Sequence, residues 1–447
     1  MKRIVLVILA SAASTVGSPL AHTQTQPPTT FAIGGGELIA AENGSVSVPA
    51  VRSDTASNSV ALTLRYVRFK SNAAKPGPPI VFLAGGPGDA ATRAFHGMPR
   101  RVLESLTAIS DVIAFDQRGT GTSEPSRVTC PPLAAGPVVK LDSPLDPAEL
   151  GAAMRRQLAA CLTEIDAAPF TTKESADDLR ALAAALEAKQ IFLLAGSYGT
   201  HLAMAAARQH PETIAGMALL GVEGPDDTLK LPSRVDGVLA EIDRAHPGVR
   251  LKVSTLADRL RRAPWTKTLP NGQNVTVGAW DLQRRVAEAL STTRDITAMI
   301  AALDPMMAGD YSDLVRWTIP FRSARPMNLM HIATDCASFA SVSRIATVRA
   351  ESGAAILGAA INFPLPDICD TPGLPRLPDA FRAPLVANVP ALLIAGTFDG
   401  RTPPPNVTDA AKGLAKAQTL FIPRASHGLF QEPAAMSAVV DFFTRLK

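Results

Sequence analysis

The chain has 447 residues, of which 47% are hydrophobic and 19% are charged, and its formal net charge is +4. This composition supports a large buried core and excludes an intrinsically disordered chain. Because the sequence contains no block of basic residues, we expect no nucleic-acid partner.

The first segment, residues 1–25, has the pattern of a secretory signal. Lys2 and Arg3 precede a short apolar run, which is followed by small residues. That run is too short to span a bilayer, and no later segment is long enough to do so. We therefore expect an exported protein, periplasmic or secreted, that has no membrane association after leader removal. An uncleaved anchor is the alternative.

The chain has four cysteines, at positions 130, 161, 336 and 369. An even number in an exported protein indicates two disulfides. Pairing of neighbours, Cys130 with Cys161 and Cys336 with Cys369, is the simplest of three connectivities, and four buried thiols are the alternative. No cysteine or histidine spacing is typical of a metal site, so we expect no metal.

The N-terminal part of the expected mature chain predicts strands. Residues 31–70 are rich in Val, Leu and Thr, with predicted hairpin connections at Asn43-Gly44 and at 53–59. Two short apolar runs follow, IVFLAGGPGDAA and DVIAFDQRGTGTS, and each ends in a glycine-rich loop.

Helical patterns then alternate with further apolar runs. Helices are predicted at about 147–165 and 175–189, and Ser175 is the predicted N-cap of the second. A strand at 191–196 and a helix at 199–209 follow, and then the apolar run GMALLGVE. Such alternation indicates a mostly parallel sheet flanked by helices, which binds ligands at the carboxyl ends of its strands.

This rhythm is interrupted once. Between about 225 and 380 the sequence has amphipathic helical patterns and one hairpin pattern, TLPNGQNVTV. We interpret this region as an inserted, mainly helical lid. The rhythm returns with VPALLIAGTFDG, so the predicted core has a first part at 31–224 and a second part at 381–447.

One serine stands on a strand-to-helix turn. In IFLLAGSYGTHLAMAAARQHP, Ser197 lies between Gly196 and Tyr198-Gly199. This arrangement is a nucleophile elbow, in which a tight turn raises the hydroxyl above the sheet edge. Ala195 stands where the strict pattern has glycine, and a small residue meets the same steric demand. An ordinary N-capping serine is the alternative.

A serine nucleophile needs a base and an acid that orients the base. Asp399 follows the predicted strand ALLIAGTF, and His427 lies in a loop of small residues after QTLFIP. The remaining histidines lie in the leader, in an early loop, on the helix after Ser197 or in the lid. The chain order serine, acid, histidine is that of α/β-hydrolases. The backbone N–H groups of Gly86 and Tyr198 are the predicted oxyanion donors.

Three motifs, GGPG, DQRGTGTS and GSYGT, together resemble the proline iminopeptidase and tripeptidyl aminopeptidase-like branch of the α/β-hydrolases. The resemblance covers nearly the whole mature chain. It implies an α/β-hydrolase fold and a serine peptidase that removes residues from peptide N-termini. Asp116 and Arg118, in the second motif, are predicted to hold loops together by ion pairing and hydrogen bonds.

The resemblance also has departures. Iminopeptidases commonly have histidine where Ala84 stands, and Ser338 occupies a lid position where the family often has an acid, although Asp335 is nearby. Aminopeptidases use acids to bind the substrate's α-amine. Glu223, at the end of MALLGVE, is the predicted amine-binding residue, and a loop-stabilising salt bridge is its alternative role.

The predicted function is therefore an exported serine hydrolase, an aminopeptidase that acts on short peptides and needs no cofactor. A carboxylic ester hydrolase acting on small esters is the alternative, because the same machinery cleaves esters more readily than amides. A non-catalytic binding protein is a remote alternative, since such a protein would be expected to have lost a triad member.

Overall fold

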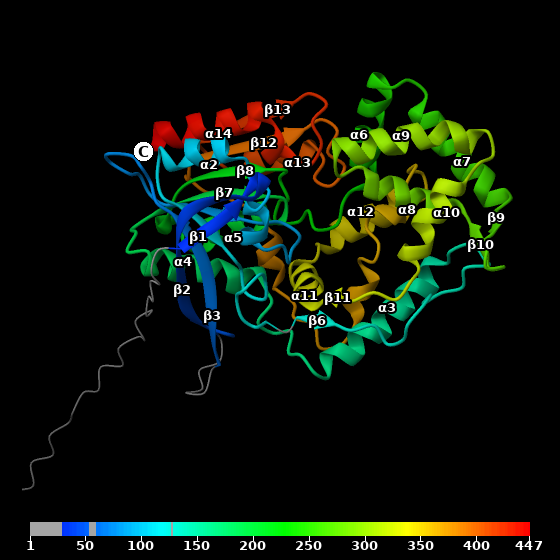
Figure 1. Cartoon of the computed structure of the whole chain (residues 1–447), viewed down its shortest axis with the longest axis horizontal. Helices are drawn as coiled ribbons and strands as arrows, with labels where there is room; N and C mark the ends of the chain where they lie inside the picture. Colours follow the sequence, from blue (N-terminus) through cyan, green and yellow to red (C-terminus); the bar gives the residue numbers. More distant parts are fainter. Residues whose placement is uncertain (1–28, 53–59, 127) are drawn as a thin grey trace, which may run out of the picture.

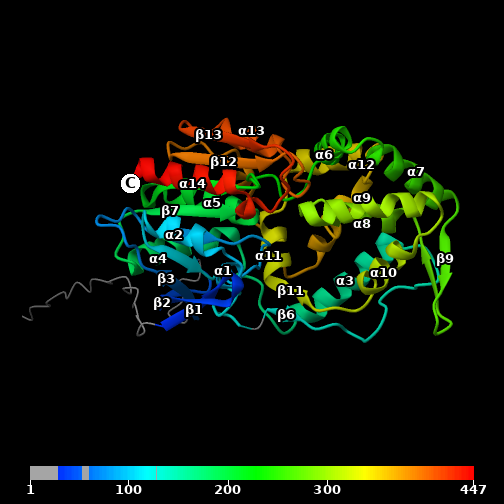
Figure 2. The ribbon, with the colours of Figure 1, turned by 45° about the horizontal axis from the view of Figure 1, so that its top comes forward.

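The computed structural model describes residues 29–52, 60–126 and 128–447 (Figure 1). The predicted leader at 1–25 and the predicted connection at 53–59 lie outside the described residues. A nine-stranded sheet occupies one half of this described part, and a layer of helices lies at one end of the sheet (Figure 2).

The sheet is mostly parallel. Pairing is antiparallel from β1 to β5 and parallel from β5 to β13. In spatial order the strands are β1 (Thr29–Ile33), β2 (Glu37–Pro49), β3 (Ala61–Phe69), β5 (Val112–Phe115), β4 (Ile80–Leu83), β7 (Ile191–Gly196), β8 (Ile214–Leu220), β12 (Ala391–Gly396) and β13 (Ala417–Ile422).

Helices cover both faces of this sheet, which explains its continuous apolar strands. Leu193 and Ala195 of β7 enter the core on one face, and Phe192 and Leu194 enter the core on the other. Every residue of β7 is buried as a result. The flanking helices are α4 (Thr172–Ala185), α5 (Tyr198–Gln209) and α13 (Pro405–Ala411) on the first face, and α1 (Ala91–Phe95), α2 (Arg100–Thr107) and α14 (Pro433–Leu446) on the second.

The predicted turn at Asn43-Gly44 is wrong, because both residues lie inside β2. Gly44 pairs directly with Tyr66 of β3. A Cβ atom at position 44 would lie 2.2 Å from the Tyr66 ring. The glycine therefore makes room for an aromatic ring on the neighbouring strand and does not form a turn.

The predicted N-cap of α4 is also wrong. Thr171 caps this helix, and its side chain accepts the N–H of Glu174. Ser175 is buried within the first turns. The earlier start places Glu174 where its carboxylate pairs with Arg52 at 2.6 Å. This contact between distant segments favours Thr171 over Ser175 as the N-cap, although the two residues are locally similar candidates.

The prediction for the DQRGTGTS motif is confirmed. Arg118 is fully buried, and its Nε donates to Asp178 Oδ2 at 2.8 Å. Its guanidinium also donates to backbone carbonyls in two other loops. Asp116 accepts hydrogen bonds from the backbone and hydroxyl of Thr92, both at 3.0 Å.

The helical layer has a hydrophobic core of its own, which joins residues of α6 to α10. The predicted hairpin at TLPNGQNVTV is confirmed, because β9 (Trp265–Thr268) pairs antiparallel with β10 (Asn274–Val277). The boundaries 225 and 380 stay a prediction. The helices are α6 (Pro232–Ala245), α7 (Val249–Arg262), α8 (Ala279–Ala289), α9 (Thr293–Met307), α10 (Ser312–Phe321), α11 (Leu329–Ser338) and α12 (Val342–Ser352).

One earlier segment lies beside this layer (Figure 1). It consists of α3 (Pro147–Leu162) and the short strand β6 (Thr129–Cys130). β6 pairs antiparallel with β11 (Met327–Asn328), which precedes α11. The segment therefore belongs spatially with residues almost two hundred positions later.

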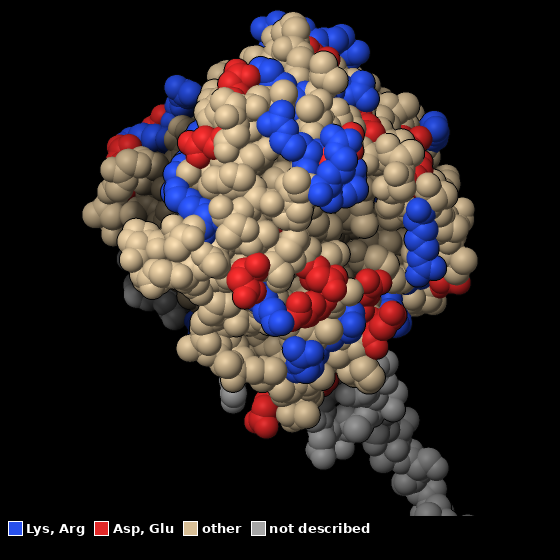
Figure 3. Space-filling view, turned by 90° about the vertical axis from the view of Figure 1, so that its right-hand side faces the viewer, with Lys and Arg blue, Asp and Glu red and all other residues tan. Residues whose placement is uncertain are grey.

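The structure contains the Cys130–Cys161 and Cys336–Cys369 disulfides, so the predicted pairing of neighbours is confirmed. Within the described residues, no helix combines the length and apolar character needed to cross a membrane. Figure 3, which faces the end with the helical layer, shows Lys and Arg side chains interspersed with Asp and Glu.

Candidate active site

Ser197 lies on a tight turn between β7 and α5. Its φ of 53° and ψ of −130° are an unusual conformation for a residue with a side chain, and such conformations cost about 1–3 kcal/mol. A Cβ at Gly196 would lie 2.5 Å from the Phe430 ring, and one at Gly199 would lie 2.3 Å from the Leu83 carbonyl oxygen. The glycines on each side of Ser197 are therefore required by close packing.

Asp399 and His427 form a hydrogen-bonded pair. Asp399 follows β12 and is fully buried, and its Oδ2 lies 2.7 Å from His427 Nδ1. Its Oδ1 accepts the backbone N–H groups of Arg401 and Thr402 at 2.8 and 2.9 Å. Burial alone would raise the pKa of Asp399, but His427 and the hydrogen bonds from the backbone and hydroxyl of Thr402 hold that pKa below its usual value.

The end of β8 brings Ser197 and His427 to one rim of the sheet. The N–H of Ser197 donates to the carbonyl of Leu220 at 3.0 Å. A Cβ at the next residue, Gly221, would lie 3.1 Å from both Cε1 and Nδ1 of His427. No hydrogen bond joins Ser197 Oγ to the imidazole in the described structure, and such bonds are commonly long without substrate.

The glycine-rich loop after β4 lies directly against Ser197. A Cβ at Gly85 would be 2.9 Å from Ser197 Cβ and 3.5 Å from its Oγ. Gly86, the next residue, has a φ of +105°, which favours glycine. The predicted oxyanion donors at Gly86 and Tyr198 thus belong to backbone segments on two sides of the serine.

A cavity of about 340 Å³ is lined by Gly86 and Glu223 at the rim of the sheet and by residues of the helical layer, and Ser197 and His427 are not among its lining residues. Glu223 follows β8 and is only 8% exposed, and its Oε1 lies 3.4 Å from the Thr228 hydroxyl. Burial raises the pKa of Glu223; His201 and Lys230 offset only part of that rise, and the nearby carboxylate of Asp335 adds to it.

Two lid residues, Asp335 and Ser338, lie in different surroundings. Asp335, on α11, lines the same cavity as Glu223. Ser338 is buried, and its hydroxyl contacts Nε2 of His201 at 3.1 Å and the Thr172 hydroxyl at 2.9 Å. The acid available from this helix is therefore three residues before the position at which the family resemblance places one.

Sequence reasoning missed four cations that line this cavity. They come from separate elements and follow no local motif, so only the fold brings them together. They are Lys230, Arg284, Arg325 and Arg401. Within the described residues, no cluster of three or more His, Cys, Asp or Glu side chains could hold a metal ion.

The sequence model of the family described as alpha/beta hydrolase fold matches residues 78–434. The serine protease Hip1 of Mycobacterium tuberculosis is 30% identical over 195 residues, which cover 41% of this chain and 36% of Hip1. The match thus spans about a third of these curated relatives, which include Hip1 of Mycobacterium bovis.

Two solved structures match most of the chain. An esterase from Thermogutta terrifontis is 17% identical with a TM-score of 0.40, and the match covers 90% of this chain and 98% of the esterase. A proline iminopeptidase from Mycobacterium smegmatis is 16% identical with a TM-score of 0.39, and the match also covers 90% of this chain and 98% of the other.

Proposed function

Because the chain belongs to the alpha/beta hydrolase fold family, we propose that it is an exported serine hydrolase whose nucleophile, base and orienting acid are Ser197, His427 and Asp399. The observation that carries this proposal is the 2.7 Å contact between His427 Nδ1 and buried Asp399, at the rim that also holds the strained turn of Ser197. The Hip1 relatives, which are named serine proteases, also support it.

The proposed reaction begins with attack of Ser197 Oγ on a substrate carbonyl carbon. His427 Nε2 accepts the hydroxyl proton and then donates it to the leaving group, while Asp399 fixes the tautomer and stabilises the imidazolium. The N–H groups of Gly86 and Tyr198 bind the oxyanion of the tetrahedral intermediate. Water, activated by His427, then hydrolyses the acyl-enzyme.

We propose that the substrate is the N-terminus of a short peptide. Glu223 and Asp335 line the cavity beside the Gly86 loop, so an α-ammonium group entering it would meet carboxylates. Such a group would offset the burial that raises the pKa of Glu223. Ester hydrolysis is the second candidate, because the same residues would cleave an activated ester without an amine.

Export is part of the proposal. The disulfides Cys130–Cys161 and Cys336–Cys369 are typical of proteins that fold in oxidising compartments. The leader at 1–25 stays a prediction from sequence.

A fluorophosphonate probe tests the nucleophile. We expect it to label the wild type and not Ser197→Ala. Ser175→Ala is the matched control, because Ser175 is buried and its Oγ has no hydrogen-bond partner among the described residues. Absence of labelling in the folded wild type would contradict the assignment.

Glu223→Gln tests the substrate. We expect about a tenfold or larger loss of kcat/KM on aminoacyl arylamides, because a charge-assisted hydrogen bond is removed, with cleavage of a short-chain ester unchanged. Equal, small effects on the arylamide and the ester would favour the esterase.

A further inference from the structure

The cavity beside the proposed triad has an unusual charge balance. Lys230, Arg325 and Arg401 line it, and none of them forms an ion pair within the described residues. Arg284 also lines it, and its ion pair, at 3.1 Å, is with Glu288, which is outside the lining. These four cations outnumber the carboxylates among the lining residues, which are Glu223 and Asp335.

The cations lie close enough to disfavour one another. Burial lowers the pKa of Lys230, and the charge of Arg401 lowers it further. Burial lowers the pKa of Arg284 to about 10, and the charges of Arg401 and Arg325 add to that shift. The carboxylates of Glu223 and Asp335 offset part of this repulsion at Lys230, and a bound anion would offset more of it.

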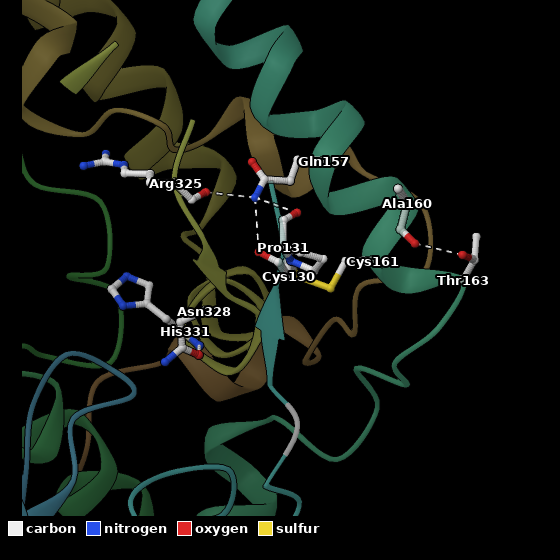
Figure 4. The surroundings of a disulfide bond; sticks show 9 residues. All are labelled: Cys130, Pro131, Gln157, Ala160, Cys161, Thr163, Arg325, Asn328 and His331. Atoms are coloured by element: carbon white, nitrogen blue, oxygen red, sulfur yellow. Dashed lines mark hydrogen bonds between the residues drawn. A yellow bond between two sulfur atoms is a disulfide. The ribbon is translucent and has the colours of Figure 1, made fainter. Parts of the chain in front are cut away.

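A second observation also favours an anionic ligand. Arg284 Nε is buried and has no hydrogen-bond partner among the described residues. Figure 4 shows the Arg325 and His331 side chains extending to the same side, away from the Cys130–Cys161 disulfide. Both residues line the cavity, so at least one arginine reaches it from the helical layer.

We propose that Lys230, Arg284, Arg325 and Arg401 bind a carboxylate group of the substrate. This inference rests on the proposed function, because it takes the cavity as the place where substrate binds. Glu223 and Asp335 would hold the substrate's amine, and the cations would hold its carboxylate. Guanidinium groups suit this role because their planar N–H pairs match the geometry of a carboxylate.

The carboxylate has two possible sources in a peptide. It can be the C-terminal α-carboxylate, which would restrict the enzyme to short peptides, or the side chain of an acidic residue. A cavity of about 340 Å³ is within the range of small-ligand sites and fits either source.

Calorimetric binding to the Ser197→Ala protein tests the proposal without requiring turnover. One arm compares Ala-Ala-Ala with its C-terminal amide. The other compares Glu-Ala-Ala amide with Gln-Ala-Ala amide. We expect at least one carboxylate peptide to bind about tenfold or more tightly than its uncharged partner, as a charge-assisted contact predicts.

Variants identify the groups responsible. In the Ser197→Ala background, Lys230→Gln and Arg401→Gln should each remove most of this preference. Arg325→Gln is a third probe that should not disturb folding, because Arg325 is exposed. Arg244→Gln is the matched control, since Arg244 is an exposed arginine of α6 outside the cavity.

The outcomes separate this inference from the proposed function. Equal affinities for the charged and uncharged peptide in both arms would overturn carboxylate binding. A preference that survives all three cavity substitutions would overturn it too. Fluorophosphonate labelling of the wild type reports on the serine hydrolase separately, so success there with failure here would reject the carboxylate site alone.

Discussion

Removal of the Cys130–Cys161 disulfide should weaken both folding and substrate binding. This bond joins β6 to the last turn of α3, and β6 pairs with β11, which follows Arg325. The disulfide closes a loop with a sequence separation of 31 residues. Loop-closure entropy for that length gives about 3.7 kcal/mol of stabilisation at about 25 °C.

The measured loss should be somewhat smaller, because residual structure in the unfolded chain reduces the entropic gain from a disulfide. The folded state should keep its geometry, because one side chain bridges the same elements. Gln157 Nε2 of α3 donates to the carbonyls of Cys130, Pro131 and Arg325 at 3.0–3.2 Å (Figure 4). These hydrogen bonds persist when the sulfur atoms are removed. We therefore expect Cys130→Ala with Cys161→Ala to lower the free energy of unfolding by about 2–4 kcal/mol.

Urea denaturation followed by tryptophan fluorescence measures this loss. All three tryptophans lie between 265 and 317, so the signal reports on the helical layer. Cys336→Ala with Cys369→Ala is the matched comparison, because its separation of 33 residues gives about the same entropy.

Activity supplies a second measurement on the same variant. On the proposed assignments, KM for a peptide with a free carboxylate should rise, because Arg325 is less firmly placed. Labelling of Ser197 should be unchanged, since the proposed triad lies on other elements. An unfolding free energy within about 1 kcal/mol of wild type would refute the entropic reasoning, and unchanged KM would refute the link to the cavity.

Two further predictions concern the buried carboxylates. Asp399→Asn should lower kcat by about 10⁴-fold, because an amide favours the wrong imidazole tautomer; a pre-steady-state assay that finds less than about a tenfold loss would contradict the triad. Burial raises the pKa of Glu223 in the folded state, so ionisation destabilises the fold as pH rises through that value. Glu223→Gln should therefore raise Tm by about 2 °C or more at pH 8 and less at pH 4; an equal change at both pH values would contradict the shift.

The sheet and the strained serine turn could be predicted because their signals are local. β7, the turn and α5 occupy one continuous stretch, and each residue's role follows from its neighbours in the chain. The corrected predictions depended on distant partners. Asn43-Gly44 resembled a turn because the reason for the glycine, the Tyr66 ring, lies on another strand. Thr171 is the cap because a helix that starts there pairs Glu174 with Arg52.

The cavity could not be predicted for the same reason. Glu223 stood out because it ends an apolar run, but Lys230, Arg325 and Arg401 have no motif that marks them. Each is an ordinary basic residue in sequence, and its significance comes from the charges that the fold places around it.

The residues proposed for catalysis and several of those proposed for substrate selection come from different parts of the fold. The three proposed triad residues are all carried on loops at the rim of the sheet, whose central strands β7 and β12 are fully buried. Asp335, Arg284 and Arg325 come from the helical layer, which the β6–β11 pair joins to the earlier segment of β6 and α3. A shift of that layer would change the spacing between the cavity's charges without moving the triad. On the proposed assignments, substitutions in the layer should therefore alter KM and substrate preference, and substitutions at the rim should alter kcat.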